Sequence, residues 1–521
     1  MRSIESTYDA IVVGSGAAGS WAAKELTEGG LKVVLLEAGR NLDIVRDFPA
    51  HAAAKSIGIV PRIKSAIRGQ HVQARSVAFS DATRHFYVND RENPYTTAPG
   101  STFRWYRGRQ LGGRLHTWYR HAPRMSNFEF KAASVRGDGI DWPLSYEDVM
   151  PYYDIVERTL GVYGVSAGIP NCPDGQFLGP AKTTKVEEAF LGKVERLLPR
   201  VRATYARKVR YDKERIALPV RLALATGRLD IRTDAVVSRL LIDAQSGKAT
   251  GVEYIERLTG HLRAVYGKVV VLCASTIESV RILQNSACAT HPSGVGGSSG
   301  HLGRYLCDHV VCTLVGKVPE SEVELGLDED GFDFGNVGLY IPSFCERESK
   351  NFPGGYGIQI SIGRGRPRWA MTAFGEMQPR YENRVSLDPI VKDAWGIPVA
   401  KIECRYSRAE TNMVAHMRQR LPEIAAVGGL RVDTVLNRIL HSGLPYPPGV
   451  AIHETGGARM GDKPDNSVVN SYCQCWDADN VFVTDGACFV HSGFQNPTLT
   501  IMALTVRACR FIVHDYAKCV S

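Results

Sequence analysis

The segment Tyr8-Asp-Ala-Ile-Val-Val-Gly-Ser-Gly-Ala-Ala-Gly19 decides the fold class of this chain. Its apolar first half predicts a buried strand, and its glycines follow the spacing Gly14-x-Gly16-x-x-Gly19. Glycines at this spacing permit a tight turn, let the backbone approach a pyrophosphate and allow the next helix to pack on the strand. The apolar spacing after Gly19 predicts that helix, and its N-terminus would face the phosphate charge.

A second apolar strand over residues 32–37 ends in Glu37, 23 residues after Gly14. An acidic side chain at this place can bind the ribose hydroxyls of an adenosine. Because strand, turn, helix and acid stand in order, the segment predicts a Rossmann-type dinucleotide-binding domain. The alternative is a glycine-rich turn without a ligand. The loop alone leaves FAD and a nicotinamide cofactor open.

Two later segments favour a flavin. Arg107-Gly-Arg-Gln-Leu-Gly-Gly113 and Val269-Val-Val-Leu-Cys-Ala-Ser-Thr-Ile-Glu-Ser279 add further turns rich in backbone groups. FAD is long and is held almost entirely inside the protein, so it needs contacts from several parts of the chain. We therefore expect FAD.

The composition excludes several classes of protein. Of 521 residues, 44% are hydrophobic and 22% charged, which is ordinary for a soluble chain with roughly two to four domains. No apolar run approaches the ~18 residues that cross a bilayer. The net charge of +9 is mild, and no nucleic-acid motif accompanies the basic residues. We expect no membrane span and no nucleic-acid partner.

Twelve cysteines without a CxxC pair favour free thiols over a disulfide framework or a metal site. The chain enters its first strand at Tyr8, with no basic and hydrophobic leader before it. These observations predict a protein of the cytoplasm.

Near the C-terminus, the segment His453-Glu-Thr-Gly-Gly-Ala-Arg-Met-Gly461 is followed by Asn496-Pro497-Thr498, 43 residues after His453. The pair offers a titratable imidazole and an amide to one site. A neutral imidazole, with an ordinary pKa near 6.5, can take a hydroxyl proton at physiological pH. His453 is therefore the candidate base.

Together these segments resemble the glucose–methanol–choline (GMC) oxidoreductase family, and they occur in family order over nearly the whole chain. The branch with pyranose oxidases, glycoside 3-oxidases, and fructose and gluconate dehydrogenases is the most similar. The matching segments are Gly14 to Gly19 with Glu37, Leu111 to Gly113, Asp141 to Pro143, Ala274 to Ser279, Gly303 to His309, Glu382 to Val385, Asp393 to Pro398, His453 to Gly461, Val483 to Gly486, and Asn496 to Met502.

The resemblance implies an α/β fold with two parts. Residues 1–309 and 447–521 would form a discontinuous Rossmann-like FAD-binding domain, and residues 310–446 a substrate-binding domain with an antiparallel β-sheet. Residues 354–364 alternate apolar and polar in strand fashion, which agrees. The segment 320–336 is rich in Glu, Asp and Gly and is interpreted as an exposed loop or as a lid.

The resemblance also implies the cofactor-binding residues. They are Gly14, Ser15, Gly16, Ala18, Gly19, Glu37, Ala38, Arg109, Gly112, Gly113, Thr117, Val236, Ala274, Asp485, Asn496, Pro497 and Thr498.

Two positions depart from patterns found in the family. Some members link FAD covalently through a histidine four positions after the second glycine of the pair ending at Gly113. Here that position is Thr117, and a histidine stands one place earlier at His116. We therefore predict non-covalent FAD. The other departure is Asn496, which stands where glucose oxidases carry a second histidine.

Asn496 allows two interpretations. Its amide can donate a hydrogen bond to the substrate oxygen, it can be the N-cap of a helix with Pro497 at the first helical position, or it can do both. The helix that follows has an apolar face, and its dipole would favour a reduced, anionic flavin at its N-terminus.

Four further polar residues are weaker candidates. His491 lies in a loop five residues before Asn496 and could line the substrate pocket. Gln359 and Glu376 interrupt apolar strand patterns and could contact substrate. His309 is expected to close a turn by hydrogen bonds.

The leading hypothesis is an FAD-dependent oxidoreductase acting on a hydroxyl group of a sugar or glycoside. His453 would take the proton as hydride leaves for flavin N5, and dioxygen or a quinone would reoxidise the cofactor. One alternative is the same chemistry on an aminoglycoside precursor or another non-sugar alcohol. Alternatives of other classes are a non-catalytic flavin-binding subunit and a nicotinamide-dependent reductase.

Overall fold

The computed structural model describes residues 7–48, 59–80, 83–137, 139–210, 212, 214, 216–325, 337–342, 352–440 and 445–516. The predicted lid falls largely outside this set. Its first residues contain a short helical turn, η5 (Glu320–Glu322), whereas residues 326–336 lie outside the described residues.

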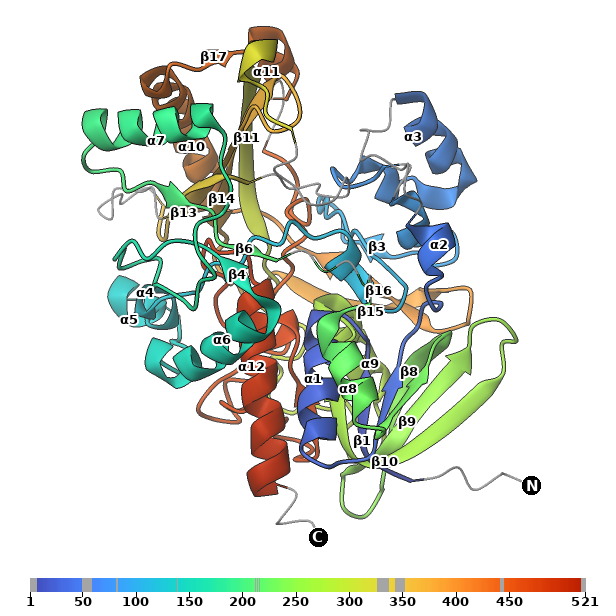
Figure 1. Cartoon of the computed structure of the whole chain (residues 1–521). Coiled ribbons are helices and arrows are strands. Elements are labelled where there is room, and N and C mark those ends of the chain that lie inside the picture. The colour runs from blue at the N-terminus through green and yellow to red at the C-terminus, as the bar shows by residue number, and fades with distance from the viewer. Residues whose placement is uncertain are drawn as a thin grey trace.

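The strand of the glycine loop lies inside a seven-stranded sheet (Figure 1). β1 (Tyr8–Val13) pairs in parallel with β2 (Val33–Leu36) on one side and with β10 (Leu262–Leu272) on the other. β7 (Leu229–Arg232) extends the sheet beyond β2, and β18 (Val481–Val483) also pairs in parallel with β10. β1 and β2 form nearly continuous apolar runs because both of their faces are covered. The predicted Rossmann-like core is confirmed.

The first half of β10 leaves this parallel arrangement. Residues 262–266 pair antiparallel with β9 (Ala249–Glu256), which pairs antiparallel with β8 (Ala235–Ile242). These strands form the lower right of the molecule in Figure 1.

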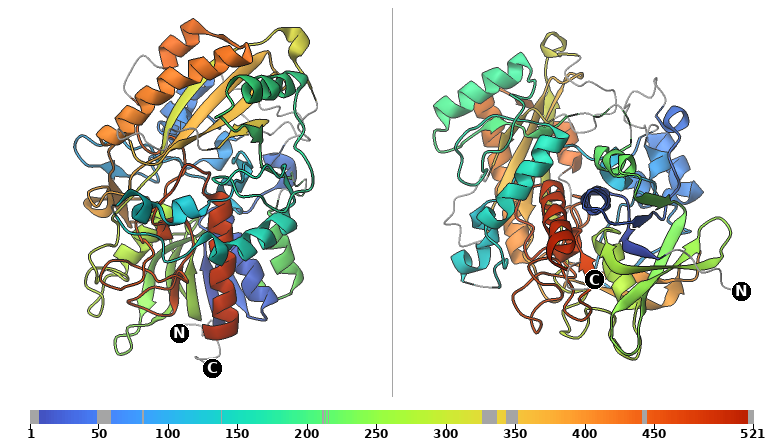
Figure 2. Two further views of the ribbon diagram at one scale, coloured as in Figure 1. Left: turned by 90° about the vertical axis from the view of Figure 1, so that its left-hand side faces the viewer. Right: turned by 60° about the horizontal axis from the view of Figure 1, so that its bottom comes forward.

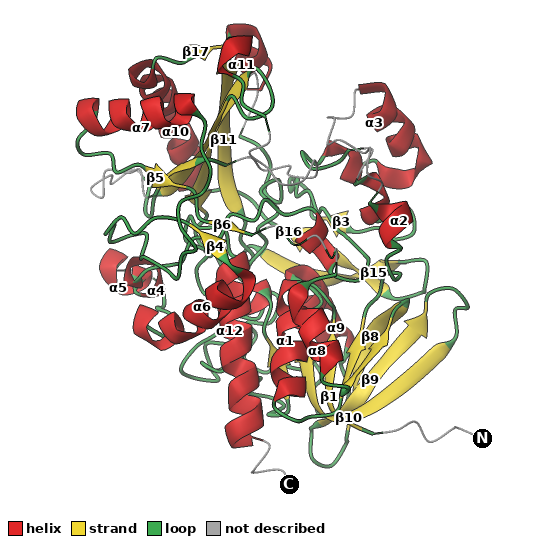
Figure 3. Cartoon of the chain, viewed as in Figure 1, coloured by secondary structure: helices red, strands yellow, loops and turns green. Residues whose placement is uncertain are grey.

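Helices bring distant parts of the chain to this sheet (Figure 3). α1 (Ala17–Glu28) contacts both α8 (Leu218–Ala225) and α12 (Thr498–Phe511), and α12 also contacts α6 (Tyr146–Leu160). α9 (Thr276–Asn285) follows β10 directly and packs on β8. The C-terminal helix thus lies beside the helix of the N-terminal glycine loop (Figure 2, right).

A second sheet of six strands occupies the other half of the molecule (Figure 1). α10 (Arg408–Gly428) packs on β11 and β14, and α7 (Lys185–Leu197) packs on α10 and β13 (Figure 2, left). The strands run in the order β17 (Arg431–Val432), β11 (His309–Lys317), β14 (Arg368–Glu376), β13 (Tyr356–Ile362), β12 (Leu339–Ile341) and β5 (Thr204–Tyr205).

Two features of this sheet go beyond what the sequence analysis predicts. The strand expected over residues 354–364 forms as β13, but all of it except Ser361 is buried rather than alternating. Helices cover one face of the sheet and the cavity described below covers the other, so even its polar residue Gln359 is enclosed. The sheet also reaches outside the predicted segment 310–446, because β5 forms its edge.

The predicted segment also contributes to the other half of the molecule. β15 (Arg384–Lys392) and β16 (Pro398–Glu403) pair with β3 (Thr96–Thr97) in a separate sheet, and both contact α9. The division into two parts follows the course of the chain less closely than the predicted bounds suggest.

The remaining elements are short. They are α2 (Ile44–Asp47), α3 (Ile59–Ser65), α4 (Asn127–Phe130), α5 (Ala132–Arg136), α11 (Thr434–Leu440), the pair β4 (Val162–Tyr163) and β6 (Lys208–Val209), and the helical turns η1 (Ala66–Gln70), η2 (Gln73–Arg75), η3 (Arg84–Phe86), η4 (Gly113–His116), η6 (Gly486–Cys488) and η7 (Ile512–Tyr516). Within the described ranges, no helix has the length and apolar character needed to cross a bilayer.

Candidate active site

A cavity of about 980 Å³ extends from the glycine loop to the face of the six-stranded sheet. One part of its wall comes from the seven-stranded half, and the other part from β11, β13 and β14. Between them lie the loop that carries His453 and the start of α12. The cavity therefore joins the two ends of the sequence at one site.

The glycine loop leaves room for a bound group. Gly14 has φ +94°, and a Cβ atom there would lie 2.4 Å from the carbonyl oxygen of Cys273. By contrast, a Cβ atom on Gly16 would meet no atom within 4 Å and would project into open space. Both residues line the cavity. This open backbone at the start of α1 fits a pyrophosphate.

Glu37 fixes this loop from the end of β2. Its buried carboxylate accepts hydrogen bonds from the backbone N–H and the hydroxyl of Ser15 and from the N–H of Gly39, the last at 2.8 Å. Burial raises the pKa of Glu37, and these hydrogen bonds oppose the shift. Glu37 also lines the cavity, as expected for an acid near a ribose.

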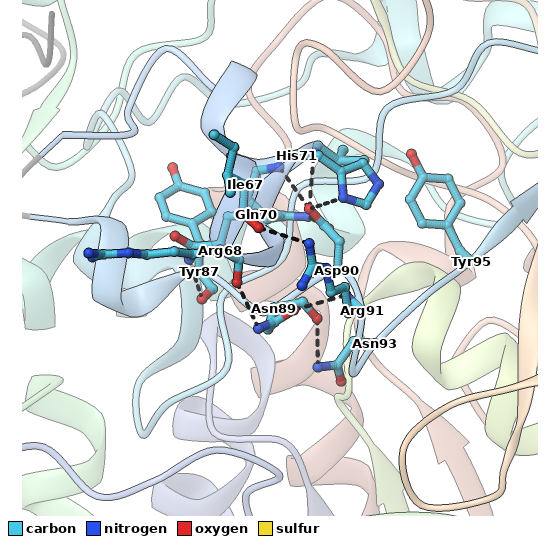
Figure 4. A network of polar contacts seen from close by, with 12 residues as sticks. Ile67, Arg68, Gln70, His71, Tyr87, Asn89, Asp90, Arg91, Asn93 and Tyr95 are labelled. Carbon is cyan, nitrogen blue, oxygen red and sulfur yellow. Dashed lines mark hydrogen bonds and ion pairs between the residues drawn. The ribbon is translucent and has the colours of Figure 1, made fainter. Parts of the chain in front are cut away.

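Arg107 and Arg109 line the same end of the cavity and are held by Gln73 and Asn93. Asn93 and Asp90 belong to the polar network drawn in Figure 4. Asp90 accepts hydrogen bonds from the Val72 N–H at 2.8 Å and from Gln73 Nε2 at 2.7 Å. Gln73 Oε1 accepts from the Arg107 N–H at 2.9 Å, and Asn93 accepts from both arginine side chains. The network places the Arg109 guanidinium where its charge acts on Glu37, and the Arg107 guanidinium lies over the Trp105 ring, 4.2 Å from its centroid.

Asp485 joins the cavity wall from the segment after β18. Its carboxylate accepts hydrogen bonds from the Ser279 hydroxyl at 2.5 Å and from the Ala487 N–H at 2.9 Å. Burial raises the pKa of Asp485 to about 6. Asp485 lines the same cavity as the glycine loop, and its contact with the cofactor stays a prediction.

His453 is presented by a loop that is tightly constrained. The preceding residue, Ile452, has φ +63°, which is a strained conformation for a β-branched residue. The buried carboxylate of Asp308 accepts three backbone N–H groups of this loop, from Gly449 at 2.7 Å, Ala451 at 3.1 Å and His453 at 3.0 Å. Asp308 thus compensates the strain and holds His453 in place.

A second histidine, His309, orients the ring of His453. His309 Nε2 lies 3.0 Å from the carbonyl oxygen of Gly493, to which it can only donate. In neutral His309, Nδ1 is then an acceptor, and it lies 2.7 Å from Nδ1 of His453. His453 therefore carries its proton on Nδ1, and its Nε2 keeps its lone pair as an acceptor.

Both imidazoles are neutral at physiological pH. Burial lowers the pKa of His309 to about 4. Burial, and then the neighbouring His309, lower the pKa of His453 well below its ordinary value. The unprotonated Nε2 of His453 is therefore available as a base.

Asn496 meets this nitrogen. In the assigned orientation of its amide, Nδ2 lies 3.2 Å from Nε2 of His453, and Oδ1 accepts a hydrogen bond from Gln359 Nε2 at 2.7 Å. The interpretation of Asn496 as a helix cap is wrong, because α12 begins at Thr498 after Pro497 and, among the described residues, no side chain caps it. The amide is occupied by Gln359 and His453 instead.

Most of the predicted site residues line this one cavity. They are Gly14, Ser15, Gly16, Ala18, Glu37, Ala38, Arg109, Gly113, Thr117, Val236, Ala274, Gln359, His453, Asp485, Asn496, Pro497 and Thr498.

Two of the predicted glycines, Gly19 and Gly112, do not line the cavity but contact residues that do. Gly19 packs so closely on the turn that a Cβ atom would lie 1.7 Å from the carbonyl oxygen of Gly14. Gly112 has φ +87°, and its N–H donates to the Ser15 hydroxyl at 2.9 Å.

Two predicted substrate residues lie outside the cavity wall. Glu376 forms a buried ion pair with Arg136 at 2.5 Å. Although burial opposes ionisation, Arg136 lowers the pKa of Glu376 to about 2. His491 Nδ1 lies 3.6 Å from Glu376, which is beyond hydrogen-bond distance, and its Nε2 lies 2.9 Å from the carbonyl oxygen of Ile140, to which it can only donate. Glu376 and His491 are thus engaged in contacts with other residues of the protein rather than with the cavity.

His116 is also separate from the cofactor cavity. Its Nε2 bonds the carbonyl oxygen of Leu111 at 2.8 Å, and its ring packs against Phe48 and Phe86. It lines a second cavity of about 500 Å³, whereas Thr117 lines the first.

Family models match most of the regions that build this site. A model described as GMC oxidoreductase matches residues 200–311, a second with the same description matches residues 379–505, and an FAD binding domain matches residues 9–58.

Several curated proteins are similar over almost the whole chain. 2-Methyl-1,2-propanediol dehydrogenase of Mycolicibacterium austroafricanum is 29% identical, with 98% of this chain and 96% of the relative covered. Fructose dehydrogenase large subunit of Gluconobacter japonicus is 26% identical, with 97% and 98% covered. 6'''-Hydroxyparomomycin C oxidase of Streptomyces lividus is 26% identical, with 98% and 92% covered.

Solved structures share the fold. A formate oxidase of Aspergillus oryzae has a TM-score of 0.71 at 14% identity, with 99% of this chain and 100% of that chain covered. Pyridoxine 4-oxidase from Mesorbium loti has a TM-score of 0.63 at 16% identity, with 97% and 99% covered.

These matches span both halves of the molecule, and the residues present at the glycine loop fit FAD. The chain is an FAD-dependent enzyme that belongs to the GMC oxidoreductase family.

Proposed function

We propose that this chain oxidises a hydroxyl group of a sugar or glycoside, with His453 as the base. The observation that carries the proposal is the polarity of one hydrogen-bond chain. Gln359 donates to Asn496, Asn496 faces Nε2 of His453, and Nδ1 of His453 donates to His309. This order leaves the lone pair of His453 on the nitrogen that faces the cavity.

The residues then perform the following steps. His453 Nε2 takes the hydroxyl proton, and the Asn496 amide donates a hydrogen bond to the oxygen as negative charge develops there. Gln359 keeps the amide in this orientation. FAD supplies the acceptor for the hydride that leaves the carbinol carbon. The alcohol loses one proton and one hydride and becomes a carbonyl compound.

We also propose that FAD is held without a covalent bond. His116 is directed away from the cofactor cavity, and Thr117 in the wall offers no ring nitrogen for a linkage.

The charge at the outer end of the cavity favours a neutral sugar over a cationic aminoglycoside. Lys317 and Arg368 lie opposite each other in the β11–β14 ladder and both line the cavity. Two facing cations repel a protonated amine. A sugar hydroxyl group has no such penalty.

The test is anaerobic mixing of the purified protein with a panel of sugars, glycosides and simple alcohols. The yellow colour should bleach with a sugar, and dioxygen or a quinone should restore it. His453→Ala should retain FAD but lose reduction by about 10²- to 10⁴-fold, and His291→Ala is the matched control because His291 bonds Gly247 on another surface. A colourless protein refutes the cofactor, and an unchanged rate in His453→Ala refutes the base.

A further inference from the structure

His121 is a buried imidazole in the cavity wall that the chemistry above does not use. Its side chain lines the same cavity as His453, and the residue is only 2% exposed. Within the described part of the chain, neither of its ring nitrogens has a hydrogen-bond partner. Buried polar side chains are nearly always paired, so this residue needs an explanation.

The backbone fixes the position of this ring. Arg120, just before it, has φ +56°, a left-handed conformation that is uncommon outside glycine. Its carbonyl accepts the N–H of Val209, and the N–H of Ala122 donates to the carbonyl of Arg207 at 2.8 Å. Two backbone hydrogen bonds thus hold the strained turn on β6. His453 is presented in the same way, since a left-handed residue precedes it and backbone hydrogen bonds hold its loop.

The ring of His121 is held without using its nitrogens. It contacts Tyr340 edge to face, with the ring centroids 4.7 Å apart. Among the described residues, the Tyr340 hydroxyl also has no hydrogen-bond partner, so this contact is not a hydrogen bond. Burial lowers the pKa of His121 to about 3, the positive charges of Arg207 and Lys208 lower it further, and a backbone group of Arg207 near the ring opposes the shift. The ring is therefore neutral, with one N–H donor and one acceptor nitrogen.

His121 faces the part of the cavity where the base lies. Tyr340 is paired with Gln359 across β12 and β13, so both side chains point to the same face of the sheet. Gln359 donates to Asn496, which meets His453. A molecule whose hydroxyl is bound between His453 and Asn496 therefore lies in the same cavity as the imidazole of His121.

We propose that His121 binds a second hydroxyl group of the substrate and selects diols and polyols over monohydroxy alcohols. This inference rests on the proposed function, because it concerns the same site. A hydroxyl is both donor and acceptor, and it can satisfy the neutral imidazole at either nitrogen. A site built to bond a hydroxyl discriminates strongly against an analogue that lacks it.

The experiment compares two matched pairs of compounds, 1,2-propanediol with 1-propanol and methyl β-D-glucopyranoside with its monodeoxy analogues. Anaerobic flavin reduction yields the rate constant and the apparent Kd for each. For the compound with more hydroxyl groups, His121→Leu should lower the ratio of the reduction rate constant to the apparent Kd by about 10- to 100-fold. For the compound with fewer hydroxyl groups, this ratio should stay within about twofold of the wild type. His121→Gln, which keeps a donor and an acceptor, should recover part of the loss.

A binding measurement separates recognition from folding. In protein labelled with ¹⁵N-histidine, 1,2-propanediol should shift the ring nitrogens of His121, and 1-propanol should not. Melting temperature and FAD content report whether His121→Leu has folded. If it has not, the wild-type comparison and the ¹⁵N shifts still decide.

If His121→Leu slows both compounds of a pair equally, or if the diol causes no ¹⁵N shift, the proposed role of His121 is overturned, and the proposed function is not affected. The proposed function fails separately, if no alcohol in either pair or in the sugar panel reduces the wild-type flavin.

Discussion

His453 is neutral at physiological pH because its surroundings oppose the charged imidazole. Burial, and then His309, place its pKa well below the ordinary 6.5. A histidine acts as a base only when it is unprotonated, so a lowered pKa extends its activity to more acidic solution. The rate constant of flavin reduction should therefore stay level as the pH falls through 6.5 and decline only below it. Anaerobic stopped-flow measurements over the acidic range check this, and a midpoint at 6.5 or above would contradict it.

His309→Leu provides the comparison for that experiment. It removes the acceptor for the Nδ1 proton of His453, so the tautomer with the proton on Nε2 becomes accessible. The level rate should fall by about tenfold or more, because part of the protein then lacks a free lone pair at the cavity. His291→Ala should leave the profile unchanged, since His291 bonds Gly247 away from the site.

At this scale, sequence reasoning found the base but not the way in which Asp308 and His309 prepare it. His453 and Asn496 stand in recognisable segments, so their meeting could be predicted. Asp308 and His309 also stand in a family segment. Asp308, however, accepts three backbone N–H groups and His309 accepts from a ring nitrogen of His453, and these contacts depend on the loop geometry. His121 had no signal of its own, because its significance lies in the partners it lacks.

The glycine loop makes different demands at its first two glycines. Gly14→Ala would place a Cβ atom 2.4 Å from a carbonyl oxygen at φ +94°, so it should destabilise the protein with or without FAD. Gly16→Ala meets no atom within 4 Å and has an ordinary φ of −70°. It should leave the melting temperature of the apoprotein within about 2 °C but weaken FAD binding, because its methyl group enters the cavity.

Reconstitution of the apoproteins with FAD, followed by fluorescence, measures this contrast. If Gly16→Ala binds FAD like the wild type, the cofactor's phosphates do not lie against this turn. If Gly14→Ala melts like the wild type, the close contact with Cys273 is not maintained in solution.

The start of α12 is held through Gln359 rather than by a cap. Gln359→Met and Asn496→Ala should each destabilise the protein by about 1 kcal/mol, because each leaves a buried amide without its partner. The double variant should lose less than the sum, since both partners are then gone. A helix cap would show additive losses instead. Urea unfolding of the four proteins gives the coupling energy.

Strand and helix positions were predictable where one face of the element is buried. β13 shows the limit of this argument. Alternation in residues 354–364 predicted a strand correctly, but the expected exposed face is enclosed by the cavity. A periodic pattern shows which residues are polar but not what they bond. Gln359 bonds Asn496 rather than water.

At the scale of the whole molecule, the separation of His116 from the cofactor cavity determines how FAD is retained. Acid precipitation of the purified protein should release all of the flavin into the supernatant, because no histidine stands at the position of the family's linkage. Absorbance near 450 nm in both fractions measures the result. A yellow pellet that persists through washing would contradict it, and peptide mapping would then identify the attachment residue.

The division of the chain into two parts came from the family resemblance and not from composition. The fold class is confirmed, whereas the bounds of the substrate part remain a proposal that must include β5 and α7. Residues 204–205 carry no signal for joining a sheet whose other strands begin about a hundred residues later. Such distant pairing is specified by packing and is not visible in a local pattern.

The left-handed residues Arg120 and Ile452 carry a consequence for anyone who engineers this protein. Glycine at either position would relieve the backbone, and a redesign guided by stability would choose these substitutions early. Each would also release the turn that aims an imidazole into the cavity. A higher melting temperature gained at positions 120 and 452 would therefore come with a less fixed imidazole orientation in the cavity, and both positions are best left unchanged.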